Sequence, residues 1–264
     1  MIKRLVRRSS TTSASRRGTN LGMVALRGNA LPDLRRIAGH FRESLNLAVD
    51  DSEINVRDEA AVVTIEGGMA GFVFMPMPIP WGDLEWPVCT AWSWPEARSS
   101  LSGHGSHVVV YASSEKMAPV RLSLCLTRAI ASVLASVESL GVYYGNASIV
   151  VPPDRYLEQA SEASETSLPL FLWLGFHPVP EKKGLSGYTT GMRMLGFLDL
   201  EVHDTNMKPS ESLGMLADIA HYELSSGIQI GRGETIGATD EERHRIVHRK
   251  SRFGNREITC QILL

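Results

Sequence analysis

A strand–helix–strand pattern in the middle of the chain constrains the fold more than any other feature. Residues 108–111 have the composition of a strand, residues 119–140 repeat apolar side chains at helical spacing, and residues 147–151 predict a second strand. Pro119 is placed to begin the helix, because proline is well tolerated in a first helical turn. Two strands joined by a helix favour a βαβ crossover, although a helix also connects antiparallel neighbours.

The same two periodicities recur along the rest of the chain and predict about nine strands and five helices in alternation. The remaining segments with such a pattern are 23–27, 34–45, 61–66, 71–75, 154–163, 170–176, 196–202, 213–224 and 258–264. This interleaving predicts an α+β fold with a single mixed, largely antiparallel sheet and helices packed mainly on one face.

Length and composition favour one domain with a short extension before it. The chain has 264 residues, of which 43% are hydrophobic, so residues 23–264 are enough for a single α+β domain with a sizeable core. Residues 1–22 hold six Lys or Arg, no acid and no long apolar run. Because such a segment buries too little apolar surface to offset its ordering entropy, we expect a disordered basic extension. An organelle transit peptide is the alternative for a leader rich in Arg and Ser.

Charge and cysteine usage exclude several classes of protein. Residues 23–264 carry 21 basic and 29 acidic side chains, and nucleic-acid affinity depends on clustered cations, so we expect no nucleic-acid partner. The apolar run at 120–142 contains three charged side chains, which predicts a core helix and no membrane span. Three widely spaced cysteines predict a reducing compartment, the cytoplasm, and no structural zinc. We expect no cofactor.

Four blocks of sequence occur in one order along the chain: MPMPIPWGDLEWPVCTAWSWPEA, LGVYYGNASIVVPP, GYTTGMRMLGFLDLEV, and YELSSG followed by GETIG. Read together, they resemble an uncharacterised bacterial family known as domain of unknown function 4261, and the resemblance runs over about residues 23–264. It implies a soluble bacterial protein. No functional residue is established for the family, so the resemblance implies no reaction.

Residues 75–97 hold four of the five tryptophans of the chain together with five prolines. Indole rings serve equally well to anchor an interface and to pack a proline-stiffened loop against a sheet. We take Trp81, Asp83, Glu85 and Trp86 as candidate binding residues, with another protein as the expected partner. The two acids lie on one short segment, which does not create the opposed carboxylate pair of a glycosidase.

We expect the four tryptophans to divide between core and surface. Residues 93–96 have the S-x-x-E spacing of a helix start. Trp92 and Trp94 should therefore pack inward where this short helix begins. Trp81 or Trp86, which lie between prolines, should be nearer the surface.

A second candidate site is the sequence D-x-E-x-H within residues 196–203. If this segment is a strand, Asp199, Glu201 and His203 share one face. Carboxylate oxygens and an imidazole nitrogen are ligands for divalent metals, so these residues are a candidate metal site. A half-exposed strand gives the same alternation without any chemistry, and no fourth ligand is implied nearby.

The remaining motifs predict no chemistry. The spacings of His104 with His107 and of His244 with His248 suit zinc only on a helix, whereas glycines surround the first pair and charges the second. Residues 231–237 are rich in glycine but lack the ending of a phosphate loop and the spacing of a dinucleotide site. These glycines are typical of tight turns.

Taken together, the patterns favour a non-enzymatic cytoplasmic protein-interaction module over an enzyme. One member of that class would be an immunity or accessory protein of a bacterial toxin or secretion system. The alternative is a metal-assisted hydrolase that uses Asp199, Glu201 and His203. A third hypothesis, a purely structural subunit, predicts a stable homo-oligomer.

Overall fold

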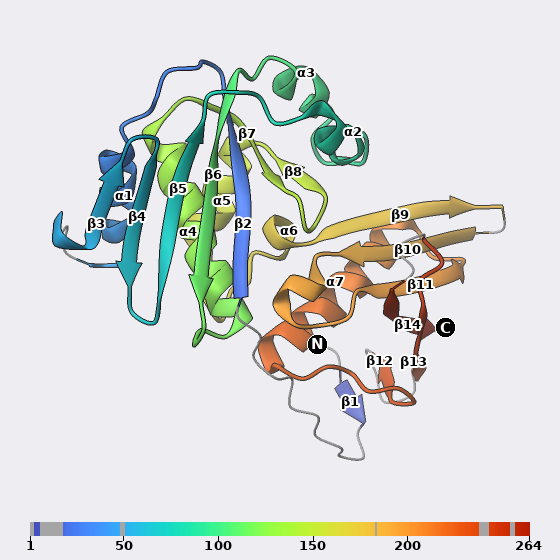
Figure 1. The fold of residues 1–264 in the computed structure, drawn as a ribbon. Helices are drawn as coiled ribbons and strands as arrows, with labels where there is room; N and C mark the ends of the chain where they lie inside the picture. The colour runs from blue at the N-terminus through green and yellow to red at the C-terminus, as the bar shows by residue number, and fades with distance from the viewer. Residues whose placement is uncertain (1–2, 6–17, 48–50, 183, 238–242, 254–256) are drawn as a thin grey trace. The chain divides into compact units, whose positions relative to one another are not determined.

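The computed structural model describes residues 3–5, 18–47, 51–182, 184–237, 243–253 and 257–264 (Figure 1). The chain divides into two compact units: the larger unit, residues 15–172, and the smaller unit, residues 1–14 with 173–264. Each unit has its own seven-stranded sheet among the described residues. The overall class is α+β, but the single sheet predicted from the sequence is wrong, because local periodicity predicts strands without determining which strands pair.

The elements of each unit follow one another along the chain. The larger unit contains β2 (Gly18–Leu26), α1 (Leu34–Ser44), β3 (Ile54–Arg57), β4 (Ala60–Ile65), β5 (Gly68–Met75), α2 (Trp81–Cys89), α3 (Ala97–Leu101), β6 (Ser106–Ser114), α4 (Pro119–Ser136), β7 (Ser139–Tyr144), β8 (Ile149–Val151) and α5 (Pro153–Glu162). After α6 (Leu170–Trp173), the smaller unit contains β9 (Gly175–Glu181), β10 (Gly184–Thr190), β11 (Leu200–Thr205), α7 (Pro209–Ser226), β12 (Thr235–Gly237), β13 (His244–Lys250) and β14 (Ile258–Leu263), together with β1 (Lys3–Leu5).

The sheet of the larger unit has the order β3-β4-β5-β6-β2-β7-β8, and every neighbouring pair is antiparallel. Because β6 and β7 both run antiparallel to β2, they run parallel to each other, and α4 crosses over between them. The helix predicted over residues 119–140 is present as α4, but it ends at Ser136. Val137 has an extended backbone, and Leu140 belongs to β7, a strand that the sequence pattern merged into the helix.

Helix α4 forms the centre of the core on one face of this sheet. It contacts β2 and β6, and α1 and α5 pack beside it, behind the sheet as drawn in Figure 1. A Cβ on Gly22 of β2 would lie 2.7 Å from Cδ1 of Ile130, so the glycine lets this side chain of α4 pack closely on the strand. Val133 of α4 is fully buried. By length and composition α4 is also the one candidate membrane span among the described helices, and most of it is buried inside the unit.

Helices α2 and α3 cover part of the other face of the same sheet. Side chains alternate along a strand, so Met23 and Ala25 point away from the face that Gly22 shares with α4. Both belong to or pack against one apolar cluster with residues of α2 and α3, including Leu84 and Leu101. The expectation of helices mainly on one face is therefore wrong for the larger unit.

The sheet of the smaller unit has the order β1-β12-β13-β14-β11-β10-β9. Its pairs are antiparallel except for β11 with β14, which are parallel. The predicted last helix is confirmed as α7, and it ends at Gly227, which has a left-handed φ of 68°. Helix α7 contacts β9, β10 and β11. A Cβ on Gly187 would lie 2.8 Å from Oγ of Ser212 and 3.6 Å from Cγ1 of Val202, so Val202 also faces α7.

The basic extension expected over residues 1–22 falls mostly outside the described residues, which omit 1–2 and 6–17. Lys3–Leu5 forms β1 and pairs with β12. Strand β2 begins at Gly18, where its register with β6 already starts, so residues 18–22 lie in the sheet of the larger unit.

Candidate functional site

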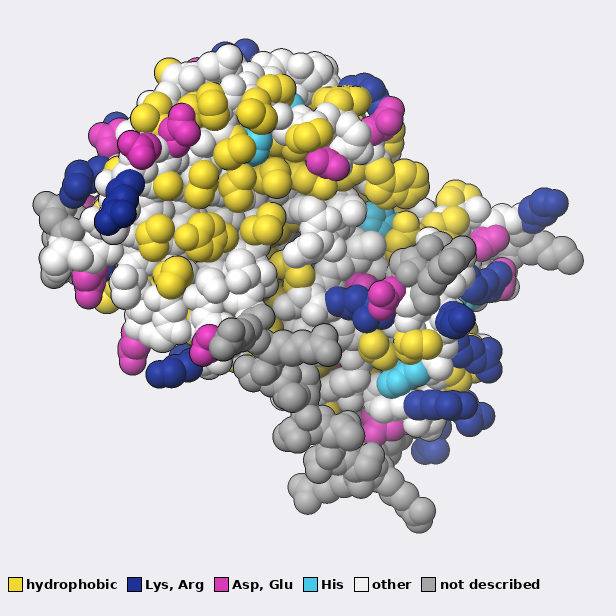
Figure 2. Space-filling model, in the orientation of Figure 1, with side chains coloured by type: hydrophobic (Ala, Val, Ile, Leu, Met, Phe, Trp, Pro, Cys, Tyr) yellow, Lys and Arg dark blue, Asp and Glu magenta, His cyan; other side chains and the backbone are white. Residues whose placement is uncertain are grey.

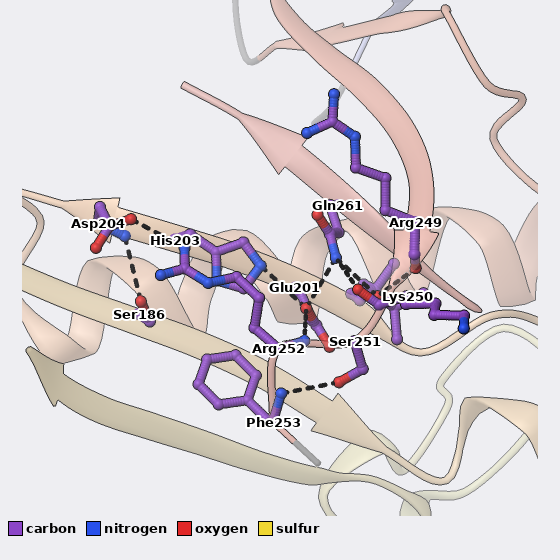
Figure 3. Close-up of polar contacts among 12 residues, drawn as sticks. Ser186, Glu201, His203, Asp204, Arg249, Lys250, Ser251, Arg252, Phe253 and Gln261 are labelled. Atoms are coloured by element: carbon purple, nitrogen blue, oxygen red, sulfur yellow. Dashed lines mark hydrogen bonds and ion pairs between the residues drawn. The ribbon is translucent and has the colours of Figure 1, made fainter. Parts of the chain in front are cut away.

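A row of side chains crosses the smaller sheet on the face opposite α7, and Figure 3 shows two of them, Glu201 and Gln261. Strand register aligns Val247 with Gln261, Gln261 with Glu201, Glu201 with Tyr188, and Tyr188 with His177. Paired residues share a face, and Glu201 lies next to Val202, which faces the helix, so the row lies on the opposite side. The predicted candidate Glu201 is at the centre of this row.

Glu201 is almost fully buried, with 1% of its surface exposed. Nε2 of Gln261 donates to Oε2 at 3.1 Å, the N–H of Arg252 approaches it at 3.4 Å, and Nε2 of His203 lies 2.9 Å away. Burial raises the pKa of Glu201, but the contacts with His203, Ser251 and the Arg252 N–H lower it by more. The pKa therefore lies below the usual glutamate value, and Glu201 is ionised at neutral pH.

The segment after β13 folds back over Glu201 and places an aromatic ring between two others. The Phe253 ring stacks on Tyr188 at a centroid distance of 4.5 Å and on His203 at 5.4 Å. Tyr188 stacks in turn on His177 at 4.7 Å. Burial lowers the pKa of His177 to about 4, so this ring is neutral at physiological pH. The stacking of the four rings and the contact of the Arg252 N–H with Glu201 hold the segment after β13 against the sheet.

The structure does not bring Asp199 into this cluster. Strand β11 begins only at Leu200, and Asp199 instead accepts a hydrogen bond from the N–H of Met192 at 3.1 Å and lies 3.7 Å from Nε of Arg193. Burial raises its pKa to about 6 in spite of these two contacts. Gly196, with a left-handed φ of 87°, ends the preceding turn and explains why the predicted strand starts later.

The cluster of Glu201 and His203 lacks the order that nucleophilic catalysis requires. Ser251 and His203 both contact the carboxylate, which therefore lies between them, whereas a catalytic triad has the imidazole between the hydroxyl and the carboxylate. Within the described part of the chain, no group of three His, Cys, Asp or Glu residues is placed to hold a metal ion. The arrangement fixes the segment after β13 to the sheet.

The tryptophan segment of the larger unit has an inner side that serves as scaffold. Trp94 is 8% exposed and belongs to the apolar cluster with Leu84, Ile79 and Leu101. A Cβ on Gly141 of β7 would lie 2.8 Å from the Trp94 ring, so the glycine makes room for the indole on the sheet. Trp94 is therefore packed inward as predicted.

Two histidines that the sequence offered as a zinc pair hold the proline-rich stretch before α2. His104 accepts a hydrogen bond from the N–H of Ile79 at 2.7 Å, and its Nδ1 donates to the Leu101 carbonyl at 2.6 Å. Nδ1 of His107 donates to the carbonyl of Met77 at 2.8 Å. The alternating prolines of this stretch cannot form the regular hydrogen bonds of a strand. The two histidines instead form hydrogen bonds with its backbone groups.

The outer side of the tryptophan segment is exposed. Trp86 is 58% exposed and Trp92 is 56% exposed. The expectation that Trp92 packs inward is wrong, because α3 begins only at Ala97 and Trp92 lies in the turn before it. Trp81 is half-buried, and the guanidinium of Arg98 lies 5.4 Å from its ring centroid.

The predicted binding residues lie together on α2. Asp83, Glu85 and Trp86 are all exposed, and Leu84 between them is fully buried in the cluster below. This alternation gives α2 an inner apolar side and an outer side of two acids and an indole. The structure thus places Asp83, Glu85 and Trp86 on one solvent-facing surface, whereas Trp81 packs against the cluster below.

The larger sheet also has an open apolar face that sequence reasoning missed. The side of this sheet away from α4 carries some polar residues, such as Thr19, Thr64, His107 and Ser113. Register also places on it nine apolar residues of β2, β4, β5, β6 and β7 that are half-buried or exposed (Figure 2). They are Leu21, Met23, Val62, Met69, Val73, Met75, Val109, Tyr111 and Tyr143. We call this set the open apolar face. Met23 and Tyr143 also pack against the cluster below α2 and α3, so the face continues into the tryptophan segment.

A signal for this face was present in the sequence. An antiparallel sheet with one solvated face normally alternates apolar and polar side chains, whereas continuous apolar strands are typical of sheets covered on both faces. Strand β5 reads GMAGFVFM and the middle of β6 reads VVVY, so the central part of both strands has no polar alternate row. These strands therefore indicate a second covering layer, and α2 and α3 supply only part of it.

Comparisons with known proteins identify one region of similarity. Residues 188–261 match the family model described as Domain of unknown function (DUF4261). The resemblance inferred from the sequence is confirmed over this stretch, which includes Tyr188, Glu201 and Gln261 of the polar row. No curated protein matches, and no solved structure matches.

Proposed function

We propose that this protein is a non-enzymatic interaction module that binds a partner protein through the larger unit. The contact surface would combine the outer side of the tryptophan segment with the open apolar face. Contiguous exposed apolar surface on a soluble domain is typical of an interaction site. A binding role is favoured over catalysis because the contact between Glu201 and His203 in the smaller unit serves to hold a segment in place.

The observation that carries the proposal is the exposure of two tryptophans on a rigid support. Trp86 and Trp92 each expose more than half of their surface, while Trp94 and Leu84 fix the same segment to the sheet. A preformed surface loses little conformational entropy on binding. Tryptophan is also among the residues that contribute most to interface affinity.

The surroundings of the tryptophans indicate the chemistry of the partner. Asp83, Glu85 and Glu96 are exposed beside them. Residues 15–172 as a whole carry 17 acidic and 12 basic side chains. A partner surface with apolar side chains at its centre and Lys or Arg at its rim would complement this arrangement, since charge complementarity increases association rate and specificity.

The cellular setting is part of the same proposal. We place the protein in the bacterial cytoplasm, and its three cysteines, all free thiols, support a reducing compartment. An immunity or accessory protein of a toxin or secretion system fits this setting and the proposed role.

Site-specific photo-crosslinking tests the proposal. A photoreactive amino acid in place of Trp86 should capture a discrete partner in cells of a bacterium that encodes the protein. The matched control carries the same photoreactive residue in place of Arg36, an exposed position on α1 on the other side of the sheet. The same products at both positions would contradict the proposed surface.

The captured partner then allows a direct measurement of affinity. With the purified partner, Trp86→Ala should weaken binding by about 2 kcal/mol or more, as expected for an interface anchor. The Arg36→Ala control should bind like the parent protein. Equal affinity for parent and Trp86→Ala would exclude Trp86 as a contact.

A further inference from the structure

The charge of the chain is distributed unevenly, and its densest run of cations lies on the smaller sheet. Residues 243–252 include five Lys or Arg and no acid. All five side chains are exposed: Arg243, Arg245, Arg249, Lys250 and Arg252. The acidic excess that argued against nucleic acid in the whole chain comes mainly from the larger unit, so it does not describe the surface around β13.

Strand register places two of these cations on the face opposite α7. Arg245 pairs with Leu263 and Arg249 pairs with Thr259, and both alternate with Val247, which pairs with Gln261 of the polar row. They therefore lie on the same face as the polar row and the stacked rings. Four residues along a strand span about 13 Å, so these two guanidiniums are spaced along a line rather than gathered at one point.

Most of these exposed cations form no ion pair within the described part of the chain. Arg252 pairs with Asp204 at 2.9 Å, but Arg245, Arg249 and Lys250 have no acidic partner among the described residues. Figure 2 shows the Lys and Arg side chains gathered on this part of the smaller unit. A line of unpaired cations attracts a chain of negative charges, because each contact releases a counterion.

Two aromatic side chains lie on the same face as these cations. Tyr188 and Phe253 are half-buried, and the Tyr188 ring is stacked between His177 and Phe253, so it offers an edge. Gln261 and Nδ1 of His203 are polar but buried, so they are not available to a ligand on this surface. Proteins that bind single strands combine cations along an extended surface with aromatic rings, and this face carries both kinds of side chain.

We propose that this face of the smaller unit binds the phosphate backbone of a single-stranded nucleic acid, with Arg245 and Arg249 as the central contacts. The binding would depend little on sequence, because phosphate contacts carry no base information. This inference is independent of the partner-protein surface proposed for the larger unit.

A competing explanation comes from the place of β13 in the sheet. Strand β12 pairs with His244 and Arg245, and the Ile246 backbone bonds to Gly233 and Glu234, so among the described residues no strand lies beside residues 247–250 on this edge. Charged side chains protect such edges from pairing with other chains. Protection alone requires no ligand, so the two explanations predict different results in a binding experiment.

Fluorescence anisotropy with a labelled oligothymidine of about 20 nucleotides, longer than most single-domain sites, tests the proposal. The full-length protein should bind it at low salt, with log K falling linearly as log salt rises. Arg245→Gln and Arg249→Gln should each weaken binding and each lower the slope by about 0.7, the value for one phosphate contact on a single strand. Arg155→Gln, which removes an exposed cation from α5, is the matched control and should leave affinity and slope unchanged.

Three outcomes would overturn the proposal. The first is no binding at low salt, which would leave edge protection as the role of the cations. The second is equal binding of poly-glutamate, which would indicate a general attraction for acidic chains. The third is tighter binding of duplex DNA than of the single strand. Thermal unfolding of each variant verifies that a lost interaction does not reflect a lost fold.

Discussion

The two units of this protein are built from the same parts, yet the exposed faces of their sheets differ in chemistry. Each has a seven-stranded sheet with an 18-residue helix that begins at a proline packed on one face, α4 in the larger unit and α7 in the smaller. The opposite face is largely apolar in the larger unit and carries Glu201, Gln261 and His203 in the smaller. Along each strand, the residues that alternate with the core residues point to the opposite face. These residues therefore determine the chemistry that each sheet presents to solvent.

The two sheets also differ in the direction of a strand that comes from a distant part of the chain. In the larger unit, β2 comes from before the crossover helix and lies antiparallel between β6 and β7. In the smaller unit, β14 comes from the end of the chain and lies parallel to β11. Similar helices thus cover sheets of different topology, and the likeness between the units is one of architecture.

The largest expected effect separates the two faces of the larger sheet. Val133→Asp places a carboxylate against the sheet at a fully buried position, which should cost about 4 kcal/mol or more and abolish soluble folding. Val62→Asp puts the same change on the open apolar face, where water reaches the carboxylate, and should leave a folded protein. Soluble yield and circular dichroism compare the two variants. A folded Val133→Asp protein would show that α4 is not the core helix.

The next effect separates the inner and outer sides of the tryptophan segment. Trp94→Ala should lower the free energy of unfolding by about 3–5 kcal/mol, as large-to-small aromatic changes in a core do. Trp86→Ala should change it by no more than about 0.5 kcal/mol, because the side chain already faces solvent. Urea unfolding measures both. Similar losses for the two variants would mean that the whole segment is core.

A pH effect should distinguish the smaller unit from the larger. Glu223 of α7 is fully buried, its Oε1 accepts from Gln229 and from the Ile230 N–H, and burial raises its pKa to about 8. The native state therefore holds this proton more tightly than the unfolded state, whose pKa is about 4.3. The stabilising contribution of the protonated Glu223 carboxyl is therefore fully present below about pH 4.3 and is lost as the pH rises toward about 8.

Glu223→Gln removes the titrating proton while keeping an acceptor for both partners. The variant should gain roughly 1–3 kcal/mol over the parent at pH 8, and its stability should change little between pH 6 and 8. Asp199, whose raised pKa is about 6, acts with the same sign only at lower pH. Chemical unfolding at a series of pH values makes the comparison, and a parent protein with constant stability from pH 6 to 8 would argue against a buried, protonated Glu223.

The smallest effect concerns the exposed ion pair that helps hold the segment after β13. Arg252 and Asp204 are both about half exposed, and a pair of this kind contributes about 0–1 kcal/mol. Arg252→Gln should therefore leave thermal unfolding almost unchanged in physiological salt. A drop of several degrees would mean that Arg252 holds the stacked rings more firmly than its exposure indicates.

Local patterns predicted the elements whose signals lie within one segment. The strands β4 and β5, the helix α7 and the terminal strand β14 follow from the periodicity of residues 61–66, 71–75, 213–224 and 258–264. The end of α4 was less predictable, because a short run of apolar residues suits a helix and a strand equally well.

Long-range pairing could not be predicted in the same way. The division into two sheets depends on which strands meet, and β2 and β14 pair with strands far away in sequence. The sequence pattern grouped Asp199 with Glu201 and His203, but Asp199 lies outside their cluster for a local reason. It precedes β11, and its carboxylate accepts a hydrogen bond from the Met192 N–H. The roles of His104 and His107 became visible only with the backbone groups that they satisfy.

The central claim is that the larger unit presents exposed tryptophans on a rigid support, and fluorine NMR tests it most directly. Protein labelled with 5-fluorotryptophan should give five resonances, one for each tryptophan, assigned with Trp→Phe variants. A soluble paramagnetic reagent should broaden the resonances of Trp86 and Trp92 strongly and leave those of Trp94 and Trp173 sharp. If Trp86 and Trp92 are as protected as Trp94, the segment is a buried plug and the proposed contact surface does not exist.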